Sequence, residues 1–212
     1  MRKLLLLVAV GALLWSQMAW AEDLQPPPWR GNWSTTSQVW EFNNPVSPGV
    51  PLPPDGPAVG GQPPLPSTEL TWTPGPPPWD QWLPMDQGRV GVVPLSGWLD
   101  VIVDNHNPPN EVKKVWVQLT WRPQDQGEVP IIQDLDPDPV QPPTIIEEVQ
   151  LEEGWVETTY YWEIRPNPPD EIFAIGGTIN VDELVIDTWC IPEPATVLLL
   201  GAGLMGLLRR RR

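Results

Sequence analysis

Apolar and polar side chains alternate along three segments in the second half of the chain. In residues 112–121, one face carries Val115, Val117, Leu119 and Trp121, and the opposite face carries Lys114, Trp116, Gln118 and Thr120. Residues 98–104 and 155–165 show the same period of two. This period is typical of antiparallel strands that bury one face and expose the other. We therefore expect the first face of 112–121 in a core and the second toward solvent.

Shorter runs rich in β-branched and aromatic residues predict further strands. They are found at residues 35–42, 68–73, 89–93, 128–132, 144–150, 171–175 and 184–188. Turn-forming sequences such as Asn-Pro-Pro and Gly-Gly lie between them. Many short strands without a convincing helix predict an all-β, antiparallel β-sandwich, either jelly-roll-like or immunoglobulin-like. A partly open barrel is the alternative.

Proline limits what the rest of the chain can form. There are 31 prolines and 17 glycines, and both are concentrated in residues 45–78. Such a segment cannot be helical, and the part of it before the predicted strand at 68–73 is expected to be a stiff loop or linker. The 14 tryptophans argue against disorder. Before the first strand, residues 25–33 form an expected exposed lead-in with Trp29 and Trp33 as anchors.

The N-terminus has the layout of a cleavable export signal. Arg2 and Lys3 precede an apolar run, and Ala19 and Ala21 supply the small residues that signal peptidase accepts. We expect a signal helix in residues 1–21 and a mature chain that begins at Glu22. The apolar run is short for an uncleaved membrane anchor, which is the alternative.

The C-terminus has three features in a fixed order. Pro192, Glu193 and Pro194 come first, an uncharged apolar run follows at 195–208, and Arg209, Arg210, Arg211 and Arg212 come last. The run predicts a short transmembrane helix, and the arginines predict a cytoplasmic stop. An ordinary tail anchor is the alternative.

These three features resemble the PEP-CTERM sorting domain of Gram-negative bacteria. The resemblance covers residues 191–212 and implies an exosortase as partner, transient anchoring in the inner membrane, removal of the tail, and delivery to the cell surface or extracellular matrix. It implies nothing about residues 22–190, which we expect to form the β-sandwich domain.

Charge and cysteine content narrow the function of that domain. Residues 22–190 hold 26 acidic and six basic residues, a net charge of −20. Such a charge repels phosphates, so we exclude nucleic acid as a partner. Cys190 is the one cysteine in the sequence, so no intrachain disulfide can form.

The sequence offers few groups for catalysis. The single histidine, His106, lies in a predicted turn without a nucleophile motif nearby, and we expect no enzyme activity and no cofactor. Asp134, Asp136 and Asp138 place three carboxylates at alternate positions, which is a possible calcium site, although a solvated acidic turn is the simpler interpretation.

Aromatic side chains suggest one binding hypothesis. Trp79, Trp82 and Trp116 are candidates for stacking on sugar rings of an extracellular polysaccharide, and tryptophans packed on prolines or in the core are the alternative. The sequence thus predicts a non-enzymatic protein, exported and displayed at the surface or in the matrix. A carbohydrate-binding module and an acidic extracellular hydrolase are the rival predictions.

Overall fold

The computed structural model describes residues 25–75, 81–104, 112–135, 142–165 and 170–191. This part of the chain contains no α-helix, only a single 3₁₀ turn, η1 (Glu152–Gly154). The predicted signal helix in 1–21 and the predicted hydrophobic helix in 195–208 lie outside the described residues. The strands are β1 (Thr35–Trp40), β2 (Glu69–Thr73), β3 (Leu83–Asp86), β4 (Arg89–Leu95), β5 (Trp98–Asp104), β6 (Val112–Pro123), β7 (Ile131–Asp134), β8 (Thr144–Gln150), β9 (Val156–Ile164), β10 (Asp170–Gly176) and β11 (Ile179–Ile191).

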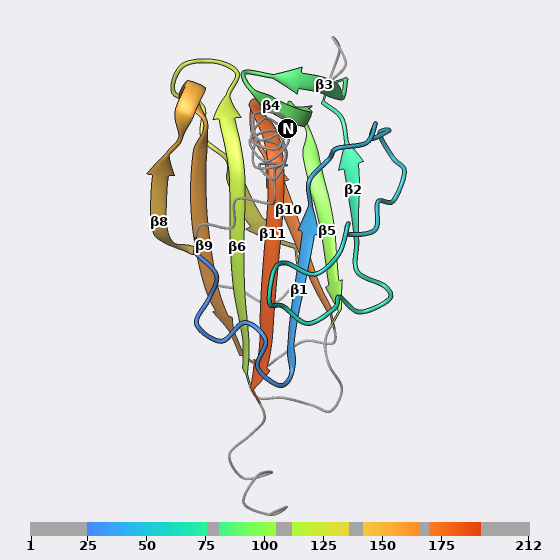
Figure 1. The fold of residues 1–212 in the computed structure, drawn as a ribbon, viewed down its shortest axis with the longest axis vertical. Coiled ribbons are helices and arrows are strands. Elements are labelled where there is room, and N and C mark those ends of the chain that lie inside the picture. The colour runs from blue at the N-terminus through green and yellow to red at the C-terminus, as the bar shows by residue number, and fades with distance from the viewer. Residues whose placement is uncertain (1–24, 76–80, 105–111, 136–141, 166–169, 192–212) are drawn as a thin grey trace, which may run out of the picture.

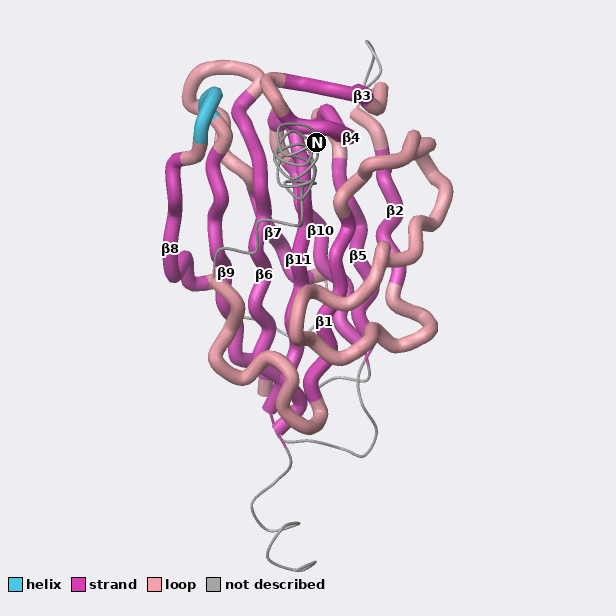
Figure 2. The backbone as a smooth tube through the Cα atoms, viewed as in Figure 1, coloured by secondary structure: helices cyan, strands magenta, loops and turns pink. Residues whose placement is uncertain are grey.

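The strands form two sheets in a sandwich-like arrangement (Figure 1). The larger sheet has seven strands in the order β3-β4-β11-β6-β9-β8, with β1 paired to β11 as well. The smaller sheet has the order β2-β5-β10-β7 and lies behind the larger one (Figure 2). Every pairing between strands is antiparallel. The expected all-β, antiparallel class is therefore confirmed.

Strand β11 organises the larger sheet. Its 13 residues pair with β6 along one edge, from Ile179 to Ile191. Along the other edge it pairs first with β4, through Ile179–Val181, and then with β1, through Leu184 to Trp189. Three strands that are distant in sequence thus depend on one shared neighbour.

The core lies between the two sheets and follows the predicted alternation. The side chains of Val115, Val117, Leu119 and Trp121 are all buried, as are Leu99, Val101 and Val103 of β5. The rings of Trp162 and Phe173 come from opposite sheets and have centroids 5.4 Å apart. Burial of this apolar surface is the main driving force for joining the sheets.

The outer face of the larger sheet is more buried than the alternation predicts. Gln118 and Thr120, expected toward solvent, are buried, and so are all six residues of β1. Part of the reason is that other segments cover this face. Gly56 of the proline-rich segment bridges to Val39, and Ala58 packs with Val39 and Val185 in a small cluster. The segment expected to be a loop or linker therefore packs on the sheet.

Two strand predictions need correction. Strand β3 was not predicted, because Pro84 interrupts the apolar pattern and proline is rare inside strands except at an edge. Among the described strands it pairs with β4 alone, through a tight turn in which Gln87 and Gly88 both have positive φ. The strand expected at 128–132 instead occupies Ile131–Asp134, since Pro130 has no N–H to donate to a ladder.

Candidate functional sites

The end of β11 leads directly into the predicted sorting signal. Ile191 is its last residue, and Cys190 beside it is buried. Pro192, Glu193, Pro194, the arginines at 209–212, and Ala19 and Ala21 lie outside the described residues. No linker separates the central strand of the sheet from the position where the signal begins. Any enzyme that acts on residues 192–194 therefore works next to the end of β11.

The lead-in segment crosses the outer face of the larger sheet near that end. The ring of Trp29 stacks on Trp189 of β11, with centroids 5.9 Å apart. Lys114 of β6 places its Nζ 5.5 Å from the centroid of the same Trp189 ring. Trp29 is buried, so the expected anchor is confirmed. Trp33 is not an anchor, because its side chain is 73% exposed.

A buried ion pair fixes the same segment. The guanidinium of Arg30 donates from Nε to Oδ1 of Asp187 at 2.8 Å, and from its second nitrogen to Oδ2. The two side chains are only 5% and 1% exposed. Burial raises the pKa of the Asp187 carboxyl, although Arg30 and the hydroxyl of Ser37 oppose this effect. The pair ties the lead-in to the middle of β11.

An aromatic and charged group occupies the neighbouring part of the face. Trp116 and Tyr161 meet edge to face at 6.2 Å, and the hydroxyl of Tyr161 donates to Glu163. Burial, followed by the charge of Glu163, raises the pKa of Tyr161 to about 12. Burial raises the pKa of Tyr160, on the core side of β9, to about 12 as well. Both phenols thus stay protonated at any physiological pH.

The three tryptophans expected to stack on sugars are not equivalent. Trp82 packs against the core and donates from Nε1 to the carbonyl oxygen of Phe42 at 2.7 Å. Trp116 is half-buried, and its Nε1 donates to the carbonyl oxygen of Gln25 at 3.1 Å. Trp79 lies outside the described residues. The structure does not bring Trp82 and Trp116 together on one open surface.

The remaining predicted groups lie mostly beyond the described segments. His106, Asp136 and Asp138 belong to undescribed residues, and Asp134 closes β7. Within the described ranges, no group of three or more histidine, cysteine or carboxylate side chains is placed to hold a metal ion. The calcium hypothesis stays a prediction.

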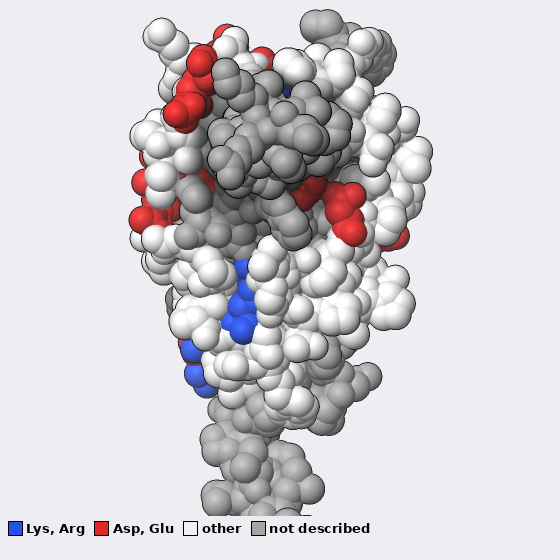
Figure 3. Space-filling view, in the orientation of Figure 1, with Lys and Arg blue, Asp and Glu red and all other residues white. Residues whose placement is uncertain are grey.

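Charges are unevenly distributed over the surface. On the face shown in Figure 3, acidic side chains lie in the upper half and along the β8 edge, and the few basic ones lie in the lower half. Lys114 lies over the ring of Trp189, and Arg30 and Arg165 pair with Asp187 and Glu163. Because acidic residues greatly outnumber basic ones in residues 22–190, the net field is strongly negative.

A buried ion pair that was not predicted joins the two sheets near the end of β11. Lys113 of β6 has its Nζ 4.0 Å from Oε1 of Glu171 of β10, and neither side chain is exposed. Lys113 is also the register partner of Cys190. The period of two places Lys113 on the same face as Val115, so the alternation already indicated that Lys113 points into the core. Such a pair orients the sheets but adds little net stability, because both charges are desolvated.

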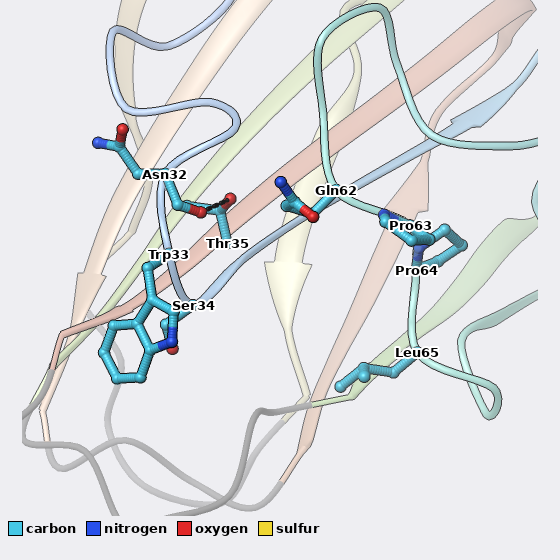
Figure 4. Close-up of a pocket in the computed structure, with 8 residues that line it drawn as sticks. All are labelled: Asn32, Trp33, Ser34, Thr35, Gln62, Pro63, Pro64 and Leu65. Atoms are coloured by element: carbon cyan, nitrogen blue, oxygen red, sulfur yellow. Dashed lines mark hydrogen bonds between the residues drawn. The ribbon is translucent and has the colours of Figure 1, made fainter.

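A pocket opens at the start of β1 (Figure 4). It encloses about 390 Å³ between residues 32–35 and residues 62–65. One wall carries Asn32 and Trp33, and the other carries Gln62, Pro63 and Pro64. The sequence did not single out these residues as a group, because their two segments are brought together only by the folding of the proline-rich loop.

Comparison with known proteins identifies the C-terminal segment. The family model described as the PEP-CTERM protein-sorting motif matches residues 191–212. No curated protein and no solved structure matches the chain. The described residues include no helix long and apolar enough to cross a membrane. The motif supports export, sorting through a transient stage at the membrane, and an exosortase as processing partner. The chain is therefore a protein that carries the PEP-CTERM sorting domain at residues 191–212, joined directly to an all-β domain.

Proposed function

We propose that this protein is an exported, non-enzymatic component of the cell surface or extracellular matrix. In this proposal, signal peptidase releases the chain after Ala21, and an exosortase removes the tail near residues 192–194. The observation that carries the proposal is the sorting motif at 191–212, which begins at Ile191, the last residue of β11. We further propose a jelly-roll-like or immunoglobulin-like topology for the sandwich.

The architecture supports display rather than catalysis. The described residues form a stiff two-layer body, with the lead-in fixed to the sheet by Arg30 and Trp29. Its net charge of −20 keeps residues 22–190 soluble and repels other acidic chains. A body of this kind suits a hydrated extracellular setting. A screen with glycan and peptide substrates tests the non-enzymatic part, and turnover by the purified protein would contradict it.

The central experiment is the intact mass of the protein recovered from the surface fraction of producing cells. We expect a mass that fits a chain from Glu22 to the vicinity of Pro194, with or without an attached group. The variant Glu193→Gln keeps the shape of the motif but removes its charge, and we expect it to retain the arginine tail. The matched control Glu153→Gln changes an exposed carboxylate on η1 and leaves processing intact. A wild-type mass that includes Arg212 would contradict exosortase processing and leave a plain tail anchor.

A further inference from the structure

The pocket at the start of β1 has two walls that are fixed to each other. The backbone N–H of Ser37 donates to the carbonyl oxygen of Gln62 at 2.9 Å, which joins β1 to the proline-rich loop. The side chain of Gln62 reaches the carbonyl oxygen of Gly31 from the opposite wall at 3.4 Å. Thr35 donates to the carbonyl oxygen of Asn32 at 2.6 Å and fixes the first wall (Figure 4). The pocket is thus preformed, which lowers the entropic cost of binding.

Trp33 stands at the mouth of this pocket with an unusual exposure. Its side chain is 73% exposed, and it is the one tryptophan in the described ranges that is classed as exposed. The next residue, Ser34, has a φ of +64°, which is uncommon for a residue other than glycine. Ser34 is itself buried, and its carbonyl oxygen accepts the N–H of Cys190 at 3.0 Å. The backbone that holds the indole outward is therefore fixed by the sheet, and such constrained positions are typical of binding sites.

The lining has the chemistry of a site for a neutral, hydroxyl-rich ring. None of the eight described lining residues carries a charge. The amide of Gln62 offers both donors and acceptors, and Pro63 and Pro64 form a stiff apolar wall, whereas the Asn32 amide points away from this wall (Figure 4). An indole face accepts the C–H side of a sugar ring, while amides bind its hydroxyl groups. The negative field of the domain opposes an anionic polymer.

We propose that this pocket binds one neutral hexose unit of a polysaccharide, with Trp33 as the stacking platform and Gln62 as a hydroxyl partner. The inference goes beyond surface display, because it concerns the binding of a ligand and needs no cleavage, even though the site lies beside the end of β11 that precedes the sorting motif. It places sugar binding at a tryptophan different from Trp79, Trp82 and Trp116.

Affinity electrophoresis tests the proposal with the processed protein purified from producing cells. The probes are dextran, laminarin, hydroxyethyl cellulose and galactomannan, with alginate as an anionic comparison. We expect at least one neutral polymer to retard the wild-type protein and alginate to leave it unaffected. Trp33→Ala should weaken the retardation at least tenfold, and Gln62→Ala should weaken it to a smaller degree. Trp33→Tyr should restore part of it, because a flat ring is retained.

Two controls separate binding from folding. Met85→Ala removes a side chain of similar exposure, 65%, on β3 and should leave retardation unchanged. Thermal unfolding of Trp33→Ala should match the wild type, since an exposed ring contributes little to stability. Retardation that survives Trp33→Ala would overturn the proposal, as would no retardation by any neutral polymer. Binding of a labelled decaproline peptide, lost in Trp33→Ala while no polysaccharide binds, would assign the pocket to proline-rich peptides instead.

Discussion

The ion pair between Arg30 and Asp187 allows a quantitative test of how the lead-in is held. Replacing Arg30 with methionine keeps the long apolar stem but removes the guanidinium from a carboxylate that is 1% exposed. Removing one partner of a buried pair typically costs about 3–5 kcal/mol. We therefore expect Arg30→Met to destabilise the protein strongly at neutral pH.

The loss of stability in Arg30→Met has an upper limit that depends on pH, because the Asp187 carboxyl can take up a proton once Arg30 is removed. Keeping an aspartic acid of ordinary pKa 3.8 protonated at pH 7 costs about 4 kcal/mol, at about 1.4 kcal/mol per pH unit. Near pH 4.5 the same cost is about 1 kcal/mol. Burial already raises the pKa of Asp187 in the folded wild type. Protonation of Asp187 therefore stabilises the folded state fully at pH values below the ordinary pKa of 3.8. This stabilisation is lost as the pH rises through the raised pKa of the folded state.

Urea unfolding of the processed protein at both pH values measures this. With an m-value of about 2 kcal/mol/M, Arg30→Met should lower the midpoint by about 1.5–2 M at pH 7 and by about 0.5 M at pH 4.5. The matched control, Arg165→Met, breaks an ion pair that is 56% and 36% exposed and should cost less than about 1 kcal/mol at either pH. Equal losses for Arg30→Met at the two pH values, or a loss below about 1 kcal/mol at pH 7, would refute the reasoning.

Two further predictions concern other parts of the domain. The sequence contains two tyrosines, and burial raises the pKa of both to about 12. The native protein should therefore show little phenolate absorbance at about pH 11, whereas the tyrosines of the urea-unfolded chain should be mostly ionised at that pH. The stability that these phenols contribute is present below about pH 10 and is lost as pH rises through about 12; a native titration centred near pH 10 would contradict this assignment. Gly91→Ala should lower the free energy of unfolding, measured in urea, by at least about 2 kcal/mol more than Gly49→Ala. Both glycines have positive φ, but of the two only Gly91 has a backbone atom in the way of a Cβ, the Phe42 oxygen at 2.3 Å. Similar losses for the two variants would show that the backbone around Phe42 yields easily.

The alternation of side chains was sufficient to predict the fold class and most strands. Strands β5 and β8 have the predicted limits, because turn residues bracket them closely. Strand β11 was predicted at 184–188 but extends over Ile179–Ile191. It is buried on both faces, so its residues lose the contrast between polar and apolar positions on which the prediction depended.

The candidate sites were harder to predict, because they combine distant segments. Arg30 and Asp187 are 157 positions apart, and the pocket at Trp33 needs the proline-rich loop to fold back on β1. Composition identified tryptophan as the residue type of interest, but it could not distinguish Trp33 from Trp82. That distinction depends on which indole the tertiary packing covers. The terminal signals, in contrast, are local in sequence, and the match at residues 191–212 confirms the sorting motif.

The position of β11 also sets the order of events during export. A chain that crosses the membrane from its N-terminus delivers β1, β4 and β6 before the strand that all three share. Among the described strands, β6 has only β9 beside it until residues 179–191 emerge, and β1 has no neighbouring strand. In the export route that we propose, completion of the sheet would therefore coincide with arrival of the sorting motif at the membrane. In that route, folding of the domain and access to its processing signal would both depend on the arrival of residues 179–191.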